Sequence, residues 1–292
     1  MHVDFWKGQR QNAVMPMKSP TVRHRRLGRE LRRLRETANL SVDAAAIHLG
    51  WSQSKVNRIE NARIMISSTD IANACDLYGA DSPTKASLIQ LAKDASQRGW
   101  WTAYSDVFTG SFVGLEAEAS DIYIWQPLLI PGLLQTDKYA HELFRVGRPD
   151  FSDSDIDRHV SARMARKIVL GTPPIIRVVI DETVLRPVER PKIMAEQIEA
   201  LLGFAARDTI TIQVLPHRAG LHRGLEGAFS VMSFSEPTDP DVGYVESPAG
   251  DIYVEAPDQV RLLKLMFERL AGSALSPEES AAFLSSARSN HV

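Results

Sequence analysis

The sequence contains a single cysteine among its 292 residues, so no disulfide can form within the chain. It has no run of 18 or more apolar residues, and its N-terminal segment lacks the apolar stretch of a secretion signal. We therefore expect a cytoplasmic protein with no membrane partner. Three catalytic signatures are also absent: the Gly-x-Ser-x-Gly elbow, the Gly-x-x-x-x-Gly-Lys phosphate loop and the dinucleotide-binding fingerprint.

The remaining candidates for a catalytic or metal site are weak. His217, His222 and Glu226 lie in a Gly-rich loop, at spacings of no common metal-ligand pattern. Asp181 and Glu182 are adjacent, so on a strand they would point to opposite faces and could not act as a paired acid and base. The sequence therefore predicts no enzyme, no metal and no cofactor.

The most informative segment that is present runs from Ser41 to Asn61 and predicts two short helices joined by a tight turn. Ser41 and Ser52 can each cap a helix with a side-chain oxygen, and Gly50 suits the left-handed conformation that ends the first helix. Val56 and Ile59 then face inward, which leaves four polar side chains pointing outward. These four are Gln53, Ser54, Lys55 and Arg58. The alternative is an ordinary helical hairpin whose polar residues are only solvated.

Charge is distributed unevenly along the chain. Residues 1–63 hold 13 Lys and Arg against 5 Asp and Glu, while the remaining residues hold 21 against 31. Release of counterions from DNA phosphates favours such a local excess of positive charge. A helix with a Leu27, Leu31 and Leu34 stripe carries many of these charges, and we expect it to contact phosphates rather than to be merely solvated. Its arginines are Arg25, Arg26, Arg29, Arg32, Arg33 and Arg35.

The first part of the chain resembles the Cro/C1-type (XRE) family of helix-turn-helix regulators. The resemblance rests on RELRRLRE, on LSVDAAAIHLGWSQSKVNRIEN and on the helix that follows, capped by Ser67 or Ser68. It implies a five-helix, lambda-repressor-like fold that binds double-stranded DNA, with homodimers matching paired half-sites. Ala62 replaces the family glycine, so we expect Asn61, which tolerates a left-handed conformation, to supply the C-cap instead. The residues predicted to contact DNA are Gln53, Ser54, Lys55, Asn57, Arg58, Ser52, Arg26 and Arg63.

Composition and periodicity divide the chain into three parts. We expect residues 1–20 to form a flexible arm and residues 21–98 to form the DNA-binding domain. Residues 99–292 are expected to form a regulatory or partner-binding domain. Ser82 is expected to cap the last helix of the DNA-binding domain. Beyond it, helices alternate with strands, most of them antiparallel and in the second half. The predicted fold class is mostly α, with a mixed α+β second domain.

Motifs in residues 99–292 resemble the C-terminal domain of a group of actinobacterial regulators described as antitoxin-like. The resemblance rests on PGLLQT at Pro131–Thr136, Arg163 with Arg166, DETVLR at Asp181–Arg186 and YVE at 244–246, together with Gln197. It implies control of neighbouring genes and a small acidic partner protein encoded nearby. The alternative function is therefore an antitoxin-like protein that neutralises this partner and binds DNA for autoregulation.

Four charged residues of this domain are candidates for ligand or partner binding: Arg163, Arg166, Glu182 and Arg186. The two arginines Arg163 and Arg166 lie three apart on one helix face and can clamp a carboxylate. An internal ion-pair network is the favoured interpretation for them. Asp181, Glu182 and Arg186, at the end of a strand, could instead line a small-molecule pocket.

Overall fold

The computed structural model describes residues 22–96, 100–108, 112–171, 174–186, 190–236, 239–247 and 250–290. The chain divides into two compact units. The first contains the described residues before Gly99, with Phe108, and the second contains Trp100–Val107 and the described residues from Phe112 onward. The arm predicted at residues 1–20 and the boundary predicted near residue 98 lie outside the described residues.

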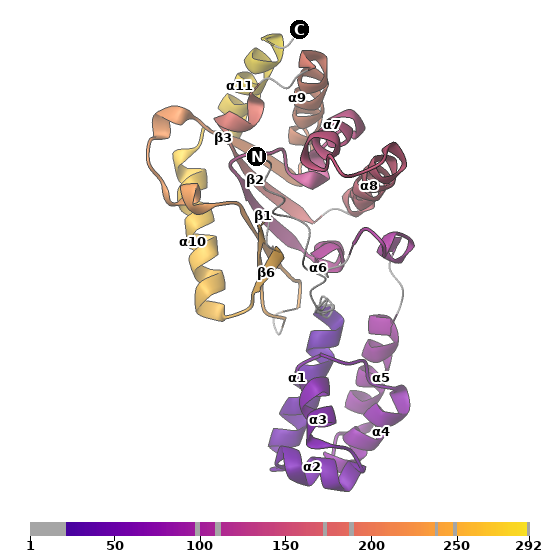
Figure 1. Ribbon diagram of the computed structural model, residues 1–292. Helices are drawn as coiled ribbons and strands as arrows, with labels where there is room; N and C mark the ends of the chain where they lie inside the picture. The colour runs from indigo at the N-terminus through magenta and orange to yellow at the C-terminus, as the bar shows by residue number, and fades with distance from the viewer. Residues whose placement is uncertain are drawn as a thin grey trace, which may run out of the picture. The chain divides into compact units, whose positions relative to one another are not determined.

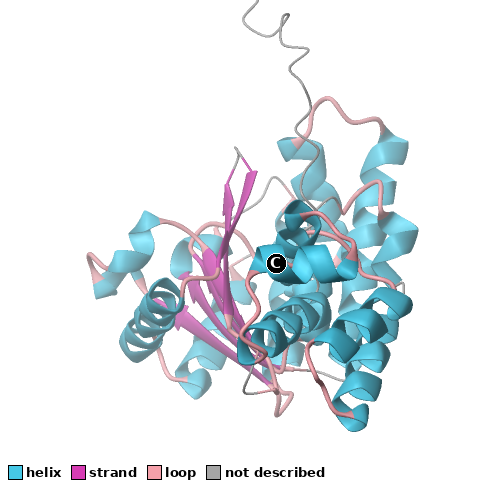
Figure 2. Cartoon of the chain, turned by 90° about the horizontal axis from the view of Figure 1, so that it is seen from below, coloured by secondary structure: helices cyan, strands magenta, loops and turns pink. Residues whose placement is uncertain are grey.

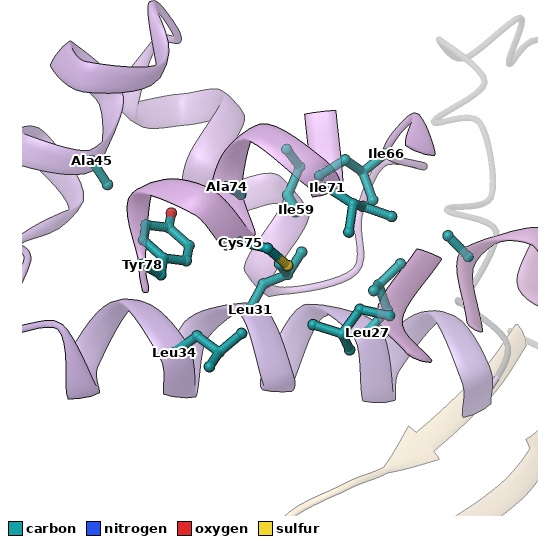
Figure 3. Packing of buried hydrophobic residues seen from close by; sticks show 12 residues of the cluster. Leu27, Leu31, Leu34, Ala45, Ile59, Ile66, Ile71, Ala74, Cys75 and Tyr78 are labelled. Carbon is teal, nitrogen blue, oxygen red and sulfur yellow. The ribbon is translucent and has the colours of Figure 1, made fainter. Parts of the chain in front are cut away.

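Five helices build the described part of the first unit, as predicted (Figure 1). They are α1 (Val22–Thr37), α2 (Val42–Leu49), α3 (Gln53–Glu60), α4 (Ser68–Leu77) and α5 (Ser82–Ser96). Their core joins the leucine stripe of α1 to the apolar side of α4 (Figure 3). Leu27, Leu31, Ile71 and Cys75 are all buried there, and burial raises the pKa of the Cys75 thiol. Cys75 is thus a small core residue.

Local capping chemistry sets the bounds of α2 and α3. The Ser41 hydroxyl accepts from the backbone N–H of Ala44, and the Ser52 hydroxyl accepts from that of Lys55. Between the helices Gly50 has φ +65°, and its N–H donates to the last turn of α2. All three predictions for this turn are confirmed.

Replacing Gly50 with Ala is expected to destabilise the first unit by about 1 kcal/mol, because a Cβ is unfavourable in the left-handed region. The added methyl would meet no atom within 4 Å, so the loss of stability comes from the left-handed backbone conformation alone and not from a steric clash. Gly147→Ala is the matched control, since it has equal space and no positive φ. Hydrogen exchange of α2 and α3 measures the effect, and unchanged protection would contradict it.

One predicted cap holds in part, and the other, Ser82, is wrong. Asn61 is the C-cap of α3, as predicted, but it has φ −93°, and the left-handed residue is Ala62 at φ +53°, in the position of the family glycine. The chain therefore keeps the turn geometry and tolerates a Cβ there. At the start of α5, the Asp81 carboxylate rather than Ser82 accepts from the backbone N–H of Thr84 at 2.8 Å.

The described residues of the second unit form one six-stranded sheet in the order β3-β2-β1-β4-β5-β6. Strand β1 pairs parallel with β2, and β2 pairs parallel with β3, whereas the β1–β4, β4–β5 and β5–β6 pairs are antiparallel. The strand bounds are β1 Asp121–Gln126, β2 Ile175–Asp181, β3 Ile210–Leu215, β4 Phe229–Ser233, β5 Val242–Ser247 and β6 Gly250–Val254. The predicted α+β class is confirmed.

Helices lie on both sides of this sheet (Figure 2). Its described α-helices are α6 (Phe112–Glu118), α7 (Asp137–Gly147), α8 (Asp153–Ala165), α9 (Pro191–Ala205), α10 (Pro257–Ser273) and α11 (Pro277–Ser289). Val260, Met266 and Phe267 of α10 are buried against Trp125 and Val179, so this helix stripe packs into the core. No helix in the described ranges is both long and apolar enough to cross a membrane.

Candidate nucleic-acid interface

Helix α3 divides cleanly into a buried and an exposed side. Val56 and Ile59 are 1% and 3% exposed and anchor the helix in the core of the first unit. Their spacing of three residues leaves the opposite side in solvent. The exposed residues on that side are Gln53, Ser54, Asn57 and Arg58, all of which were predicted as DNA contacts. The helix therefore presents amide, hydroxyl and guanidinium groups together.

Lys55 differs from these neighbours because its ammonium is already engaged. Its Nζ lies 3.0 Å from Oδ2 of Asp70 in α4 and 4.2 Å from the ring centroid of Trp51. The side chain is only about one-third exposed. Lys55 thus links the start of α3 to α4, a role that sequence reasoning missed. Ser52 is exposed, with its hydroxyl accepting from the Lys55 backbone.

A buried ion pair holds the other end of α3. Arg35 of α1 donates from Nε and Nη2 to Glu60 at 2.6 and 2.9 Å, and from Nη1 to the Leu40 carbonyl at 2.7 Å. The two charged side chains are 8% and 6% exposed. The hydrogen bond to Glu60 raises the pKa of Arg35. Fork-to-fork pairing of this kind fixes geometry as well as charge.

Helix α1 also approaches the end of α3 closely at Gly28. A Cβ built on Gly28 would lie 2.7 Å from the carbonyl oxygens of both Ile59 and Glu60. These are backbone atoms, so they cannot move aside without shifting α3. The two sequence segments that carried the family resemblance therefore pack against one another at Gly28 and through the Arg35–Glu60 ion pair.

The arginines of α1 separate into different roles. Arg25 and Arg35 are buried, at 9% and 6% exposed, so their assignment to DNA phosphates is wrong. Arg32 and Arg33 lie on the surface and pair with Glu36 and Glu30, respectively. Of the two arginines predicted for DNA contact outside α3, Arg26 is half-buried and Arg63 is exposed.

Arg163 and Arg166, predicted as ligand or partner candidates, form an internal network in the second unit. Arg166 donates to Glu116 of α6 at 2.6 and 3.0 Å, and the pair is 11% and 1% exposed. Arg163 donates to Oε1 of Gln135 at 2.7 Å. Burial and the neighbouring charge of Arg166 lower the pKa of Arg163 to about 10. The favoured interpretation as an ion-pair network fits these contacts.

Two family models match this chain. A helix-turn-helix domain matches residues 26–88, which include α2 and α3. A domain of unknown function (DUF5753) matches residues 109–286, which is more than half of the chain. The chain belongs to the DUF5753 family. No curated protein and no solved structure matches it.

The helix-turn-helix match identifies a DNA-binding regulator, whereas the DUF5753 domain carries no assigned function. Within this domain the PGLLQT motif is held by buried amides. Gln135 donates to the Ile130 carbonyl at 2.7 Å, and Gln197 accepts from the Thr136 N–H at 2.6 Å while donating to the Leu134 carbonyl. Both glutamines are at most 1% exposed. The motif therefore fixes a loop of the DUF5753 domain.

Gly132 of this motif has a specific steric role. A Cβ at Gly132 would lie 2.8 Å from Nη1 of Arg166 and 3.2 Å from Nη1 of Arg163. The absence of a side chain lets the two guanidinium groups approach the loop backbone. The two arginines follow Gly132 by 31 and 34 residues in the sequence, and this close approach brings them together with the loop.

The other candidate residues of the DUF5753 domain lie elsewhere. Glu182 accepts from the backbone N–H of His217 at 2.9 Å, and Asp181 accepts from that of Thr183 at 2.7 Å. His217 meets the Thr183 hydroxyl at 2.9 Å. Arg186 lines a separate cavity beside α7. The four predicted ligand candidates are therefore not brought together at one site.

Proposed function

We propose that the chain is a sequence-specific transcriptional regulator of the Cro/C1 (XRE) type that reads operator DNA with α3. The observation that carries this proposal is the exposed polar side of α3 on a helix whose ends are fixed by capping and by the Arg35–Glu60 pair. Gln and Arg side chains form paired hydrogen bonds with adenine and guanine edges, respectively. Gln53 and Arg58 are our base-reading residues.

The proposal includes a homodimer and control through residues 99–292. One α3 offers few base contacts, and two copies match half-sites about one helical turn apart. Ser52, Ser54, Asn57, Arg26 and Arg63 then supply the remaining contacts, with phosphates as partners for the arginines. Lys55 can contact DNA only after its ion pair with Asp70 breaks.

Arg58→Ala is expected to weaken operator binding by about 1–3 kcal/mol, because a base-reading guanidinium is lost. Binding to unrelated DNA of the same length should change far less. Fluorescence anisotropy at one fixed salt concentration measures both. Arg261→Ala, an exposed arginine of α10, is the control. An equal loss on both DNAs would reassign Arg58 to a phosphate contact.

A second function is favoured by exposed apolar residues on α10. Leu262 and Leu265 are 44% and 46% exposed on a helix whose other side packs into the core. Such residues suit a protein partner, in line with the antitoxin-like alternative. Co-purification with the product of the adjacent gene is the test. A monodisperse protein without a partner would count against it.

We also propose that the chain acts by binding and not by catalysis. The adjacent carboxylates Asp181 and Glu182 accept from backbone N–H groups and so stabilise the ends of β2 and β3. His222 packs edge-on against Trp125, away from the Thr183 hydroxyl that His217 meets. A screen of hydrolase substrates with the purified chain should give no turnover.

A further inference from the structure

A cavity of about 250 Å³ lies within the second unit. One side of α7 forms a wall, because Tyr139, Glu142, Leu143 and Val146 recur at helical spacing. The rest of the wall comes from α9, from Val184 with Arg186, and from the loop that precedes PGLLQT. Most lining side chains are apolar, and the volume suits a small ligand.

Glu142 is the unusual member of this wall. The residue is only 8% exposed; its carboxylate oxygens keep some accessible surface, and no hydrogen bond or ion pair engages them among the residues that the structure describes. A carboxylate among apolar side chains is rarely left without a partner, because partial removal of its charge from water is costly. An unpartnered carboxylate in a cavity wall therefore favours a ligand that carries a positively charged donor.

Arg186 supplies the opposite charge at the same cavity. Its side chain is exposed, and across the described part of the chain no carboxylate lies within the 4.0 Å of an ion pair. Glu142 and Arg186 thus line one cavity without pairing with each other. A ligand with only a negative charge would be repelled by the Glu142 carboxylate. A ligand with only a positive charge would be repelled by the Arg186 guanidinium. Charge complementarity selects a molecule with both charges.

We propose that this cavity binds a small zwitterion with an apolar body, of the class of hydrophobic α-amino acids. Its ammonium group pairs with Glu142 and its carboxylate with the Arg186 guanidinium, both as charge-assisted hydrogen bonds. Its side chain packs against Leu143, Val146 and Met194. The loop that precedes PGLLQT is held against this wall, since the Ile130 N–H donates to the Tyr139 hydroxyl.

Isothermal titration calorimetry of the full chain without DNA tests the site, with L-phenylalanine and L-leucine as probes. At least one should bind saturably at one site per chain. Phenethylamine and 3-phenylpropionate, which each lack one charge, should bind about tenfold more weakly or worse. No saturable binding of either amino acid would overturn the proposal, as would equal binding of the single-charge analogues.

Variants separate the site from nonspecific binding. Glu142→Gln and Arg186→Gln should each weaken amino-acid binding about tenfold or more, since each removes one charge-assisted contact. Arg186 is exposed, so its variant keeps the test valid if Glu142→Gln fails to fold. Arg145→Gln, on α7 but outside the cavity, is the matched control and should bind normally. Undiminished binding by the Arg186 variant would overturn the assignment.

The idea that the cavity controls DNA binding rests on the proposed function. It therefore needs a measurement separate from amino-acid binding. Operator affinity measured with and without saturating amino acid should differ if the cavity is regulatory. Binding without any change in operator affinity would keep the site and remove the regulatory role. If the cavity bound no amino acid, the proposal that α3 reads operator DNA would still stand. Failure of the ligand site and failure of the proposed function are therefore distinguishable.

Discussion

Glu60→Ala is expected to lower the stability of the first unit by about 3–5 kcal/mol, enough to unfold it in a chain of ordinary stability. The substitution leaves the Arg35 guanidinium buried at 8% exposure, with the Leu40 carbonyl as a hydrogen-bond partner and only the exposed Glu36 carboxylate, 3.6 Å from Nη2, to balance its charge. It also frees the end of α3. Hydrogen exchange of α1–α5 measures this unit separately from the second, because exchange reports stability locally.

Two further variants distinguish the buried charge from general disruption of α3. Glu30→Ala removes a carboxylate of the same helix that pairs with Arg33 on the surface, and it should leave exchange unchanged. The double variant Arg35→Met/Glu60→Leu replaces both charges with apolar groups and should recover most of the lost protection. Parent-like protection of α3 in Glu60→Ala would show that the pair does not stabilise this unit.

Glu116→Ala is expected to have a comparable effect on the second unit, again about 3–5 kcal/mol. Arg166 would lose both bonds to this carboxylate while remaining close to Arg163, whose charge is already destabilised by burial. The PGLLQT loop should then lose protection, since Gly132 contacts both guanidinium groups.

The same exchange experiment measures the Glu116 effect through the amides of α6–α9 and β1–β3. Glu196→Ala is the control, because Glu196 is exposed and pairs with Lys138 on the surface. The first unit should keep its parent-like exchange in both variants. A Glu116 variant with unchanged protection at residues 130–136 would contradict the structural role of the network.

Local chemistry accounts for what the sequence could predict. Ser41, Gly50 and Ser52 act on backbone groups within a few residues, so their caps are readable from the sequence. Strands are predicted from the sequence at 175–181 and 210–215, and β2 and β3 have these bounds because both are short apolar runs with clear ends. Asn61 and Ser82 show the limit, since Ala62 rather than Asn61 has the left-handed conformation and Asp81 rather than Ser82 caps α5.

Contacts between distant residues could not be predicted. Glu60 and Arg35 are 25 residues apart, and each alone resembles an ordinary surface charge. The parallel pairing of β1 with β2 depends on the connection between them, which no local pattern specifies. Glu142 and Arg186 line one cavity because α7 and the segment that follows β2 come together in the folded unit. Helix α6 was too short for its periodicity to be recognised.

Binding-site selection from random double-stranded DNA tests the central claim, that α3 reads operator sequence, most directly. The parent should enrich a two-fold symmetric motif with half-sites about one helical turn apart. Gln53→Ala/Arg58→Ala should still bind DNA but lose the preference at one or two base pairs of each half-site. Enrichment of the same motif by the double variant would contradict the claim that these side chains read the bases.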